Sequence, residues 1–246
     1  MRCLLLAWMT LAAQAAAQVP DSGRWQELRF PADEVGLRSE DSYIELTVAL
    51  AAAGYLDRDR ILLARVKRIT DSLVRAAVAL KPDAAAWPWE VHLTDDVAVE
   101  AESRAGGKLL LGRTFVSRLA LDDAELAFLL AHEIAHAIAE HARETLSEAL
   151  LDSRRDLPLE VVEERLASDI PLQFRLSRLS AIQEREADQL GILIAHRAGW
   201  PCAAAERFYR KLAADAGAAS ASLFASHPSA TSRLSLAKGM SRLLGD

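Results

Sequence analysis

Residues 129–136 read Leu-Leu-Ala-His-Glu-Ile-Ala-His and contain the pattern His-Glu-x-x-His. On a helix, His132 and His136 lie one turn apart on the same face, where both imidazoles can hold one zinc ion. Glu133 is displaced by about 100° around the helix, which places it beside such an ion as a base and not as a ligand. The alternative is an amphipathic helix on which the two histidines are half-buried polar residues without a metal.

The surrounding sequence predicts that this pattern lies in the middle of a long helix. Asp122, followed three residues later by Glu125, is a capping-box signature. No Gly or Pro occurs in residues 124–143, so one uninterrupted helix is expected there. On such a helix His141 would face away from the metal, about 140° from His136, which predicts a structural role for it.

A zinc site of this kind needs a third protein ligand, which the extended pattern His-Glu-x-x-His-x-x-Gly-x-x-His would place at position 142. This position is Ala, so the ligand must come from elsewhere. Residues 184–188 read Glu-Arg-Glu-Ala-Asp, and Glu184 is predicted to complete a set of two His and one Glu. Asp188, one turn further, is predicted to accept a hydrogen bond from the outer nitrogen of a ligand imidazole. The alternative is a solvated acidic face paired with Arg185.

The rest of the chain predicts one mostly helical α+β domain. Apolar periodicity and the Pro and Gly positions predict helices at 44–55, 61–80, 172–198, 201–216 and 228–244, and strands at 89–94 and 108–111. No internal repeat supports a second domain. We expect a single domain over residues 41–246, with its small sheet next to the His-Glu-x-x-His helix, preceded by an irregular lead-in over residues 18–40. The amphipathic stretch 147–171 either covers the cleft as a lid or packs against the domain.

The N-terminus has the three-part pattern of a secretory signal: Arg2, an apolar run over residues 3–13, and small residues up to Ala17. We expect cleavage near Ala17. The apolar run is shorter than the roughly 20 residues that span a bilayer, so an exported, soluble mature protein is expected. An uncleaved signal that acts as an anchor is the alternative. Removal of residues 1–17 would leave Cys202 as the sole cysteine, without a partner for an intramolecular disulfide.

Composition narrows the classes of partner. The chain has 29 basic and 35 acidic residues, a net charge of −6, and no basic cluster. Nucleic-acid binding is therefore excluded, because it relies on Lys and Arg that neutralise backbone phosphates. The expected partners are proteins or peptides, and the residues do not indicate an oligomeric state.

Several further residues match one known family. They are His132 to His136, His141, Glu184 to Asp188, His227-Pro228 followed by Arg233, and Gly106-Gly107 ahead of Lys108 to Leu111. On these residues, over about positions 95–240, the chain resembles the HtpX and CAAX-prenyl-protease type of zinc metalloendopeptidases, which includes soluble periplasmic members. Two departures bear on substrate preference and not on zinc. Glu140 stands where the family often has Arg, and residues 99–102 replace an Asn-Ala element.

The resemblance implies a zincin-like fold, one zinc ion and hydrolysis of peptide bonds. Zinc lowers the pKa of a bound water from its high value in bulk solvent towards about 7, while Glu133 takes the proton and passes it to the leaving amine. The resemblance also implies His227 or Arg233 as donors to the tetrahedral oxyanion. The implied substrates are extended or misfolded proteins in the bacterial periplasm, and a peripheral association with a membrane stays open.

Substrate binding and the type of activity leave alternatives. If Leu109, Leu110 and Leu111 form an exposed sheet edge, an extended substrate can add to it as a further strand. Two other functions are a latent peptide-binding or chaperone-like module with a structural zinc, and a zinc hydrolase of non-peptide amides. The presence of Glu133 argues against the first, and an edge strand would favour peptides over the second.

Overall fold

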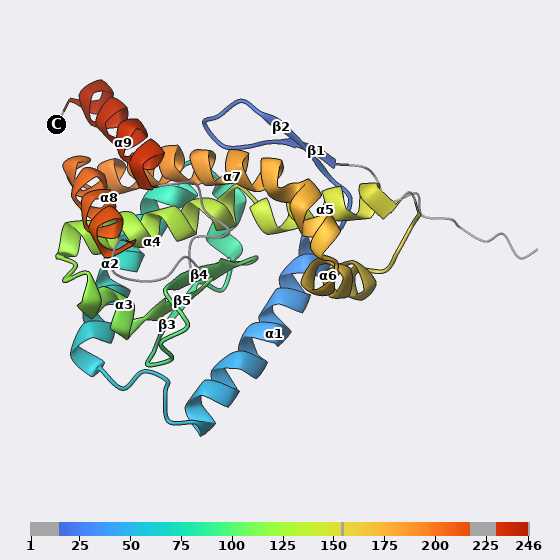
Figure 1. The fold of residues 1–246 in the computed structure, drawn as a ribbon, viewed down its shortest axis with the longest axis horizontal. Coiled ribbons are helices and arrows are strands. Elements are labelled where there is room, and N and C mark those ends of the chain that lie inside the picture. Colours follow the sequence, from blue (N-terminus) through green and yellow to red (C-terminus); the bar gives the residue numbers. More distant parts are fainter. Residues whose placement is uncertain (1–14, 154, 217–229, 246) are drawn as a thin grey trace, which may run out of the picture.

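Helix α4 (Asp123–Ile138) carries the His-Glu-x-x-His pattern and is surrounded by the other elements of the fold. The computed structural model describes residues 15–153, 155–216 and 230–245. In chain order the other elements are β1 (Ala15–Gln18), β2 (Trp25–Leu28), α1 (Ala32–Ala52), α2 (Arg60–Val78), the 3-10 helix η1 (Pro82–Ala86), β3 (Glu90–Thr94), β4 (Ala101–Arg104), β5 (Lys108–Gly112), α3 (Arg113–Arg118), α5 (His141–Ser153), α6 (Leu159–Ser168), α7 (Ile170–Arg197), α8 (Ala203–Ala216) and α9 (Ala230–Leu244) (Figure 1). The expected mostly helical α+β domain with a small sheet is confirmed. Within the described residues, no helix is both long and apolar enough to cross a membrane.

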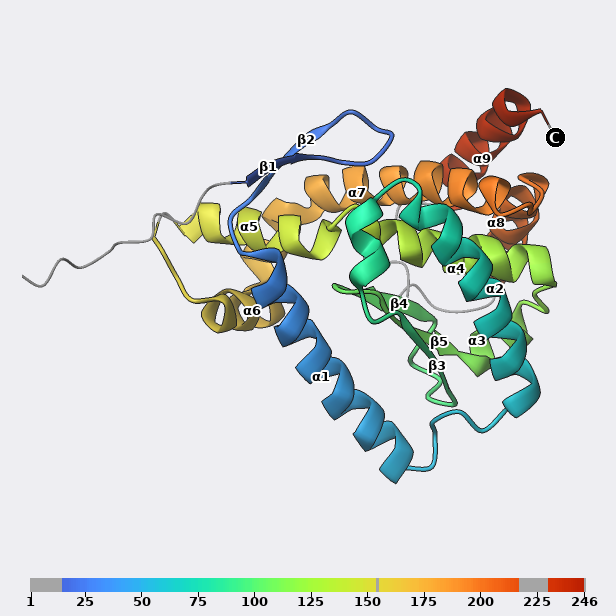
Figure 2. The same ribbon diagram turned by 180° about the vertical axis from the view of Figure 1, so that it is seen from behind.

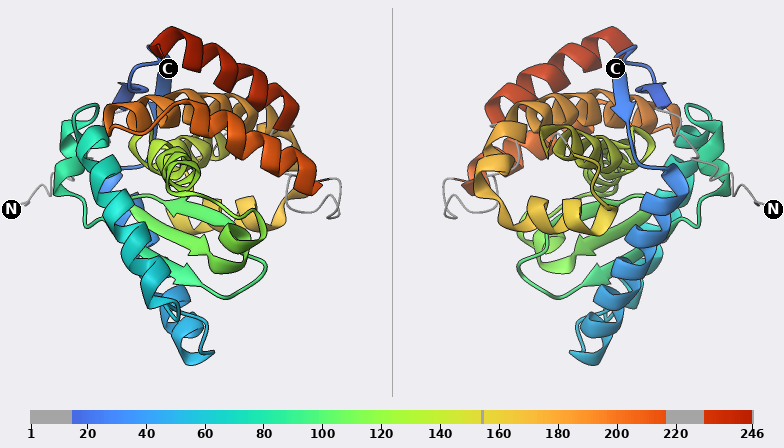
Figure 3. Two further views of the ribbon diagram at one scale, coloured as in Figure 1. Left: turned by 90° about the vertical axis from the view of Figure 1, so that its left-hand side faces the viewer. Right: turned by 90° about the vertical axis from the view of Figure 1, so that its right-hand side faces the viewer.

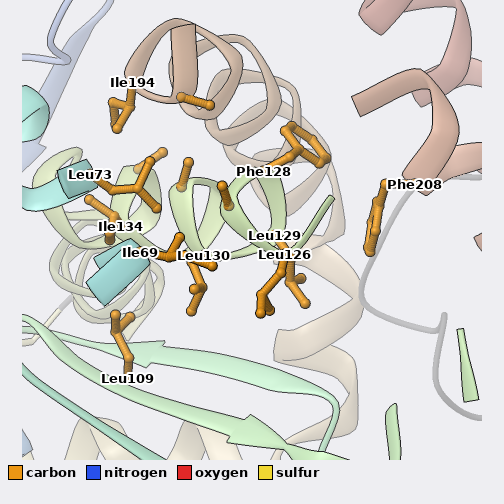
Figure 4. Packing of buried hydrophobic residues seen from close by; sticks show 14 of the residues in the cluster. Ile69, Leu73, Leu109, Leu126, Phe128, Leu129, Leu130, Ile134, Ile194 and Phe208 are labelled. Carbon is orange, nitrogen blue, oxygen red and sulfur yellow. The ribbon is translucent and has the colours of Figure 1, made fainter. Parts of the chain in front are cut away.

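Helix α4 is buried on nearly all of its faces. Figure 3 shows it end-on, with α7 on one side and the sheet on the other. Figure 4 shows side chains from other elements around it: Leu109 from β5, Ile69 and Leu73 from α2, Ile194 from α7 and Phe208 from α8. A helix that is apolar all round is stable only inside a core, which explains why the sequence around the motif is so rich in Leu, Ile and Ala. The core therefore holds the motif helix rigidly.

The three-stranded sheet has the order β3-β5-β4, with β5 parallel to β3 and antiparallel to β4. Successive side chains of a strand point to opposite faces. Leu109 and Leu111 join the core around α4, while Leu110 packs with Tyr43 and Leu50 of α1 on the other face. Both faces are covered, which explains the unbroken apolar run of β5.

The expectation that Leu109, Leu110 and Leu111 form an exposed sheet edge is wrong. They lie in the central strand and are each 1% exposed. Among the described residues, the free edge of the sheet beside the motif helix belongs instead to β4, whose sequence Ala-Glu-Ser-Arg lacks the apolar alternation that reveals a strand. The expected strands at 89–94 and 108–111 are confirmed as β3 and β5.

The long helix expected over residues 124–143 is in fact two helices. Helix α4 ends at Ile138, and α5 begins at His141. Between them Glu140 adopts a left-handed backbone conformation with φ of 55°. A helix ends readily with such a residue, but Gly is the usual one, so the sequence contains no warning of the break. The side-chain amide of Gln26 donates to the Ala139 carbonyl at 3.0 Å, which satisfies one of the groups that the break exposes.

The segment 18–40 is not irregular, contrary to expectation. Strand β1 pairs antiparallel with β2 in a hairpin, and α1 begins directly after Pro31. Along β2, the buried residues Gln26 and Leu28 alternate with exposed ones. The positions of Pro and Gly, on which the expectation of an irregular segment depends, do not reveal this alternation. Strand β1 spans the expected cleavage point at Ala17, while residues 1–14 lie outside the described part, so the signal and the domain limits stay predictions.

The stretch 147–171 packs against the domain. Leu159 and Val162 of α6 are buried in a second cluster with Phe30, Val35 and Leu172. This arrangement favours the packing alternative over a lid. The expected helices at 61–80, 172–198 and 201–216 correspond to α2, α7 and α8. The helix expected at 44–55 is the second half of the longer α1, which begins at Ala32. The helix expected at 228–244 corresponds to α9 from Ala230 onwards, and residues 228–229 lie outside the described part.

The capping box at the start of α4 leads to a first prediction. The Asp122 carboxylate accepts from the Glu125 backbone N–H at 2.8 Å, and the Glu125 carboxylate accepts from the Asp122 N–H at 2.9 Å. Burial raises the pKa of Asp122, but the Glu125 N–H and the Arg207 guanidinium outweigh it and hold the pKa below its ordinary value. Asp122→Ala should therefore cost about 1 kcal/mol of unfolding free energy at pH 7.

The difference in unfolding free energy between wild type and Asp122→Ala should shrink in acid. A depressed folded-state pKa means that the carboxylate stabilises the fold above its unfolded pKa of 3.8 and stops doing so as the pH falls further. Urea unfolding of wild type and Asp122→Ala at pH 7 and at about pH 3 measures this. A difference that grows in acid would contradict the prediction.

Candidate metal centre

The three predicted ligands come together where α4 and α7 lie side by side. One donor atom from each of His132, His136 and Glu184 lies within 4.8 Å of the others. The two Nε2 atoms of the histidines are 3.1 Å apart. The Glu184 carboxylate approaches them at 3.5 Å from His132 Nε2 and 3.3 Å from His136 Nε2. Two imidazole nitrogens and a carboxylate oxygen are the donor set of many catalytic zinc sites, so the chemistry of these residues fits zinc.

The outer nitrogens of both ligand imidazoles are held by other side chains. His132 Nδ1 lies 3.0 Å from Asp188 Oδ1, and His136 Nδ1 lies 2.9 Å from His141 Nδ1. A contact at Nδ1 fixes the orientation of the ring and leaves Nε2 for a metal. Asp188 thus occupies the place that the sequence predicts for it.

His141 is where the expected geometry fails. The sequence predicts that it faces away from the metal, as it would on one continuous helix. The break at Glu140 turns the start of α5 so that the His141 ring meets His136. Burial lowers the pKa of His141 to about 4, so the ring is neutral near pH 7.

A buried polar network surrounds Asp188, which is 1% exposed. Arg233 donates from Nε to Oδ2 at 2.9 Å and from Nη2 to Oδ1 at 2.5 Å, and the Tyr209 hydroxyl also donates to Oδ1. Burial raises the pKa of Asp188, but the hydrogen bonds from His132 and Arg233 outweigh it and bring the pKa to about 2. The carboxylate is therefore ionised and can orient His132 at any physiological pH.

Glu133 lies between two cavities along the edge strand β4. The larger has a volume of about 720 Å³ and is lined by Glu133, His136, β4 and the first turns of α1. The smaller, about 50 Å³, shares Glu133 and Ala101 with it and is otherwise mostly apolar; it is lined by Phe115, Phe128, Leu129, Phe208 and Leu212, among others. Glu133 is 8% exposed and beside His132, so an extended molecule in this cleft would pass both.

Comparison with known proteins identifies the family. The pattern that defines peptidase family M48 matches residues 62–241, which is most of the chain. The chain belongs to peptidase family M48. It is 30% identical over 149 residues to the mitochondrial metalloendopeptidase OMA1 of Arabidopsis thaliana. The aligned region covers 60% of this chain and 30% of that protein. It is 34% identical over 114 residues to the mitochondrial metalloendopeptidase OMA1 of Saccharomyces cerevisiae. That alignment covers 45% of this chain and 33% of the yeast protein.

The match spans about a third of the length of these curated relatives. The predicted resemblance is thus confirmed at the level of a metallopeptidase family, while the HtpX and CAAX-prenyl-protease branch stays a prediction. Within the M48 match lie α4 and α7, and therefore all three candidate ligands and Glu133.

The other predicted site residues of this M48 chain have different outcomes. Arg233 lies at the centre, but its guanidinium binds Asp188, and Nη2 is 3.5 Å from Glu184 Oε2. His227 lies outside the described residues, so its role stays a prediction. Tyr209 and strand β4 belong to the site and were missed, because neither carries a motif; only their place in the fold reveals them.

Gly191 allows α7 to come close enough to α4 to deliver Glu184 and Asp188. A Cβ at this position would lie 3.0 Å from both the N and the Cα of His132. Gly191→Ala should therefore push the two helices apart, at a cost of about 1–3 kcal/mol in unfolding free energy. The matched control is Gly239→Ala in α9, where a Cβ meets no atom of the described residues within 4 Å and helix propensity should favour Ala. Equal melting temperatures for the two variants would contradict this account.

Proposed function

We propose that this chain is a zinc-dependent endopeptidase. One observation carries the proposal: two imidazole Nε2 atoms and the Glu184 carboxylate converge beside Glu133 at the wall of a cleft that is bounded by a free strand edge. Zinc held by such a set supplies Lewis acidity, which lowers the pKa of water and polarises a peptide carbonyl. His132, His136 and Glu184 are the residues that would hold it.

The chain's own side chains have distinct roles in this mechanism. The Glu133 carboxylate takes a proton from the attacking water and returns it to the nitrogen of the leaving amine. Asp188 holds His132 through its Nδ1, and Arg233 and Tyr209 hold Asp188. Arg233 therefore orients the site by binding Asp188. The donor to the oxyanion stays a separate proposal, for which His227 and Arg233 are the two candidates.

Strand β4 replaces β5 as the proposed substrate-binding edge. Within the part of the chain that the structure describes, β5 is its one strand partner, and its residues Ala101 to Arg104 line the cleft together with Glu133. An extended peptide can add to such an edge through backbone hydrogen bonds, which explains why unfolded or misfolded chains would be suitable substrates. This feature also favours peptides over other amides.

Backbone methylation of a substrate tests the role of β4. In an added strand only every second N–H of the peptide points to its neighbour. Methylating successive backbone nitrogens of a cleaved peptide, one at a time, should raise KM strongly at alternate positions and weakly between them. A uniform effect along the peptide would count against strand addition.

Metal content and cleavage of casein by the purified chain test the activity. We expect about one zinc per chain, cleavage by the loaded protein, loss of cleavage after zinc is removed with a chelator, and recovery when zinc is restored. Zinc without cleavage would favour a latent peptide-binding module, and cleavage of non-peptide amides alone would favour the other hydrolase. Absence of zinc binding would rule out the proposed site.

We further propose that the protein is exported to a bacterial periplasm and acts there in protein quality control. The support is the signal-like sequence of residues 1–17 and the suitability of a strand edge for unfolded chains. Cell fractionation followed by N-terminal sequencing tests this location. An N-terminus near residue 18 in the periplasmic fraction is expected, whereas an intact N-terminus in the membrane fraction would favour an anchor.

A further inference from the structure

The turn over residues 19–24 and strand β2, which stay on the chain if it is cleaved near Ala17, lie alongside α5 and α7 (Figure 2). They hold the side chain of Arg24 over both helices. The turn is closed by a hydrogen bond from the Val19 N–H to the Arg24 carbonyl at 2.9 Å. Val19 is 1% exposed and belongs to the main core, and the Gln26 amide binds the Ala139 carbonyl at the α4–α5 junction. Arg24 is therefore delivered to a fixed place.

Arg24 bridges two buried carboxylates from different helices. Its Nε and Nη2 donate to Glu186 of α7 at 2.7 and 2.8 Å, and Nη1 and Nη2 donate to Glu144 of α5, the latter at 2.8 Å. Glu144 is 2% and Glu186 7% exposed. Two carboxylates so placed repel each other, and a forked guanidinium can pair with both at once.

Glu186 in turn faces the pair of histidines that ends at a candidate ligand. Its Oε2 lies 3.4 Å from His141 Nε2, and His141 Nδ1 lies 2.9 Å from His136 Nδ1. A neutral imidazole donates at one nitrogen and accepts at the other. If His136 uses Nε2 for a metal, its proton is on Nδ1 and is donated to His141 Nδ1. His141 then carries its own proton on Nε2, which faces the Glu186 carboxylate.

We propose that Arg24 is a positioning residue of the metal centre, which acts through Glu186 and His141 on His136. The proposal rests on the proposed zinc site. Asp188, on α7, holds the imidazole of His132. The contacts that run from Arg24, ahead of α1, through Glu186 and His141 hold the imidazole of His136. The affinity for zinc thus depends on a residue that precedes the family match at 62–241 and lies on a different element from every ligand.

Zinc affinity of the full chain, measured by competition with a chelator, tests this proposal. Arg24→Met should weaken zinc binding about tenfold, the lower end of the effect expected for residues that orient ligands. Arg24→Lys should fall between, because an ammonium cannot pair in a forked manner with two carboxylates. The matched control is Arg29→Met, which removes an arginine just after β2. Among the described residues, the guanidinium of Arg29 donates hydrogen bonds to Glu27 alone. This variant should stay within twofold of wild type.

A double variant separates positioning from general damage to the fold. Glu186→Gln alone should weaken zinc binding by a similar factor, and Arg24→Met combined with Glu186→Gln should lose no more than the larger single loss. Losses that multiply, or a folded Arg24→Met with wild-type affinity, would overturn the proposal. If Arg24→Met does not fold, Arg24→Lys and Glu186→Gln decide, and wild-type affinity in both overturns it.

The wild type distinguishes this proposal from the function on which it rests. Wild type that binds no zinc would overturn both before any variant is compared. Wild type that binds zinc without cleaving casein would overturn the peptidase proposal alone, because the affinity comparison needs no turnover.

Discussion

Glu133→Gln should lower kcat by about 10²- to 10⁴-fold while the protein keeps its zinc. The amide has nearly the shape of the carboxylate but cannot take a proton from water. Glu133 is not one of the three converging donors, so zinc content should stay near that of wild type. Casein cleavage and metal content, measured on the same preparation, give both quantities.

The matched control is Glu125→Gln, which makes the same chemical change on the same helix. Glu125 is 1% exposed and belongs to the capping box at the other end of α4, where Gln can also serve. This variant loses charge pairing with Lys211 and should be less stable, but its kcat should stay close to wild type. Equal loss of activity in the two variants would remove the argument that Glu133 is the base.

Asp188→Asn should have the largest effect on the free energy of unfolding, about 3–5 kcal/mol. Asp188 is the carboxylate that binds Arg233 in a forked manner, and both side chains are buried. Without its charge, the guanidinium stays buried beside an amide that can accept but also presents donors. Zinc affinity should also fall, by about 10- to 100-fold, because the contact with His132 Nδ1 weakens.

Urea unfolding at pH 7 measures the loss of stability, with Tyr209→Phe as the comparison. That change removes one hydrogen bond to the same carboxylate but leaves the ion pair, so it should cost about 1 kcal/mol. If Asp188→Asn and Tyr209→Phe lose the same small amount, Arg233 must find its counter-charge elsewhere, with Glu184 at 3.5 Å the first candidate.

The sequence could predict the ligand set because helical periodicity brings together the residues that lie on each of the two helices. His132 and His136 share a face at a spacing of four residues, and so do Glu184 and Asp188. Only the docking of α4 against α7 had to be assumed, and Gly191 makes that contact close. Burial of the surrounding apolar residues follows in the same way from composition and period.

The remaining parts depend on tertiary structure that leaves no local pattern. Strand β4 is polar because it is an edge, so its pairing with β5 cannot be read from hydrophobic alternation. The break at Glu140 lacks the Gly that usually marks a left-handed helix end, and it reverses the direction expected for His141. Arg24 reaches Glu186 from the turn ahead of β2, at a separation along the chain that no motif records.

The arrangement of the ligands on two helices has a consequence for the order of folding. The third ligand follows the histidines only after α5 and α6, so no locally folded segment contains the complete site. The segment that contains α5 and α6 must bring α7 back against α4 before a metal can be bound by all three side chains. Metal then stabilises only the native state, by about 2.7 kcal/mol at a free concentration one hundred times its Kd. A nascent chain that has emerged only as far as α6 would therefore carry the His-Glu-x-x-His pattern without the means to act on its neighbours.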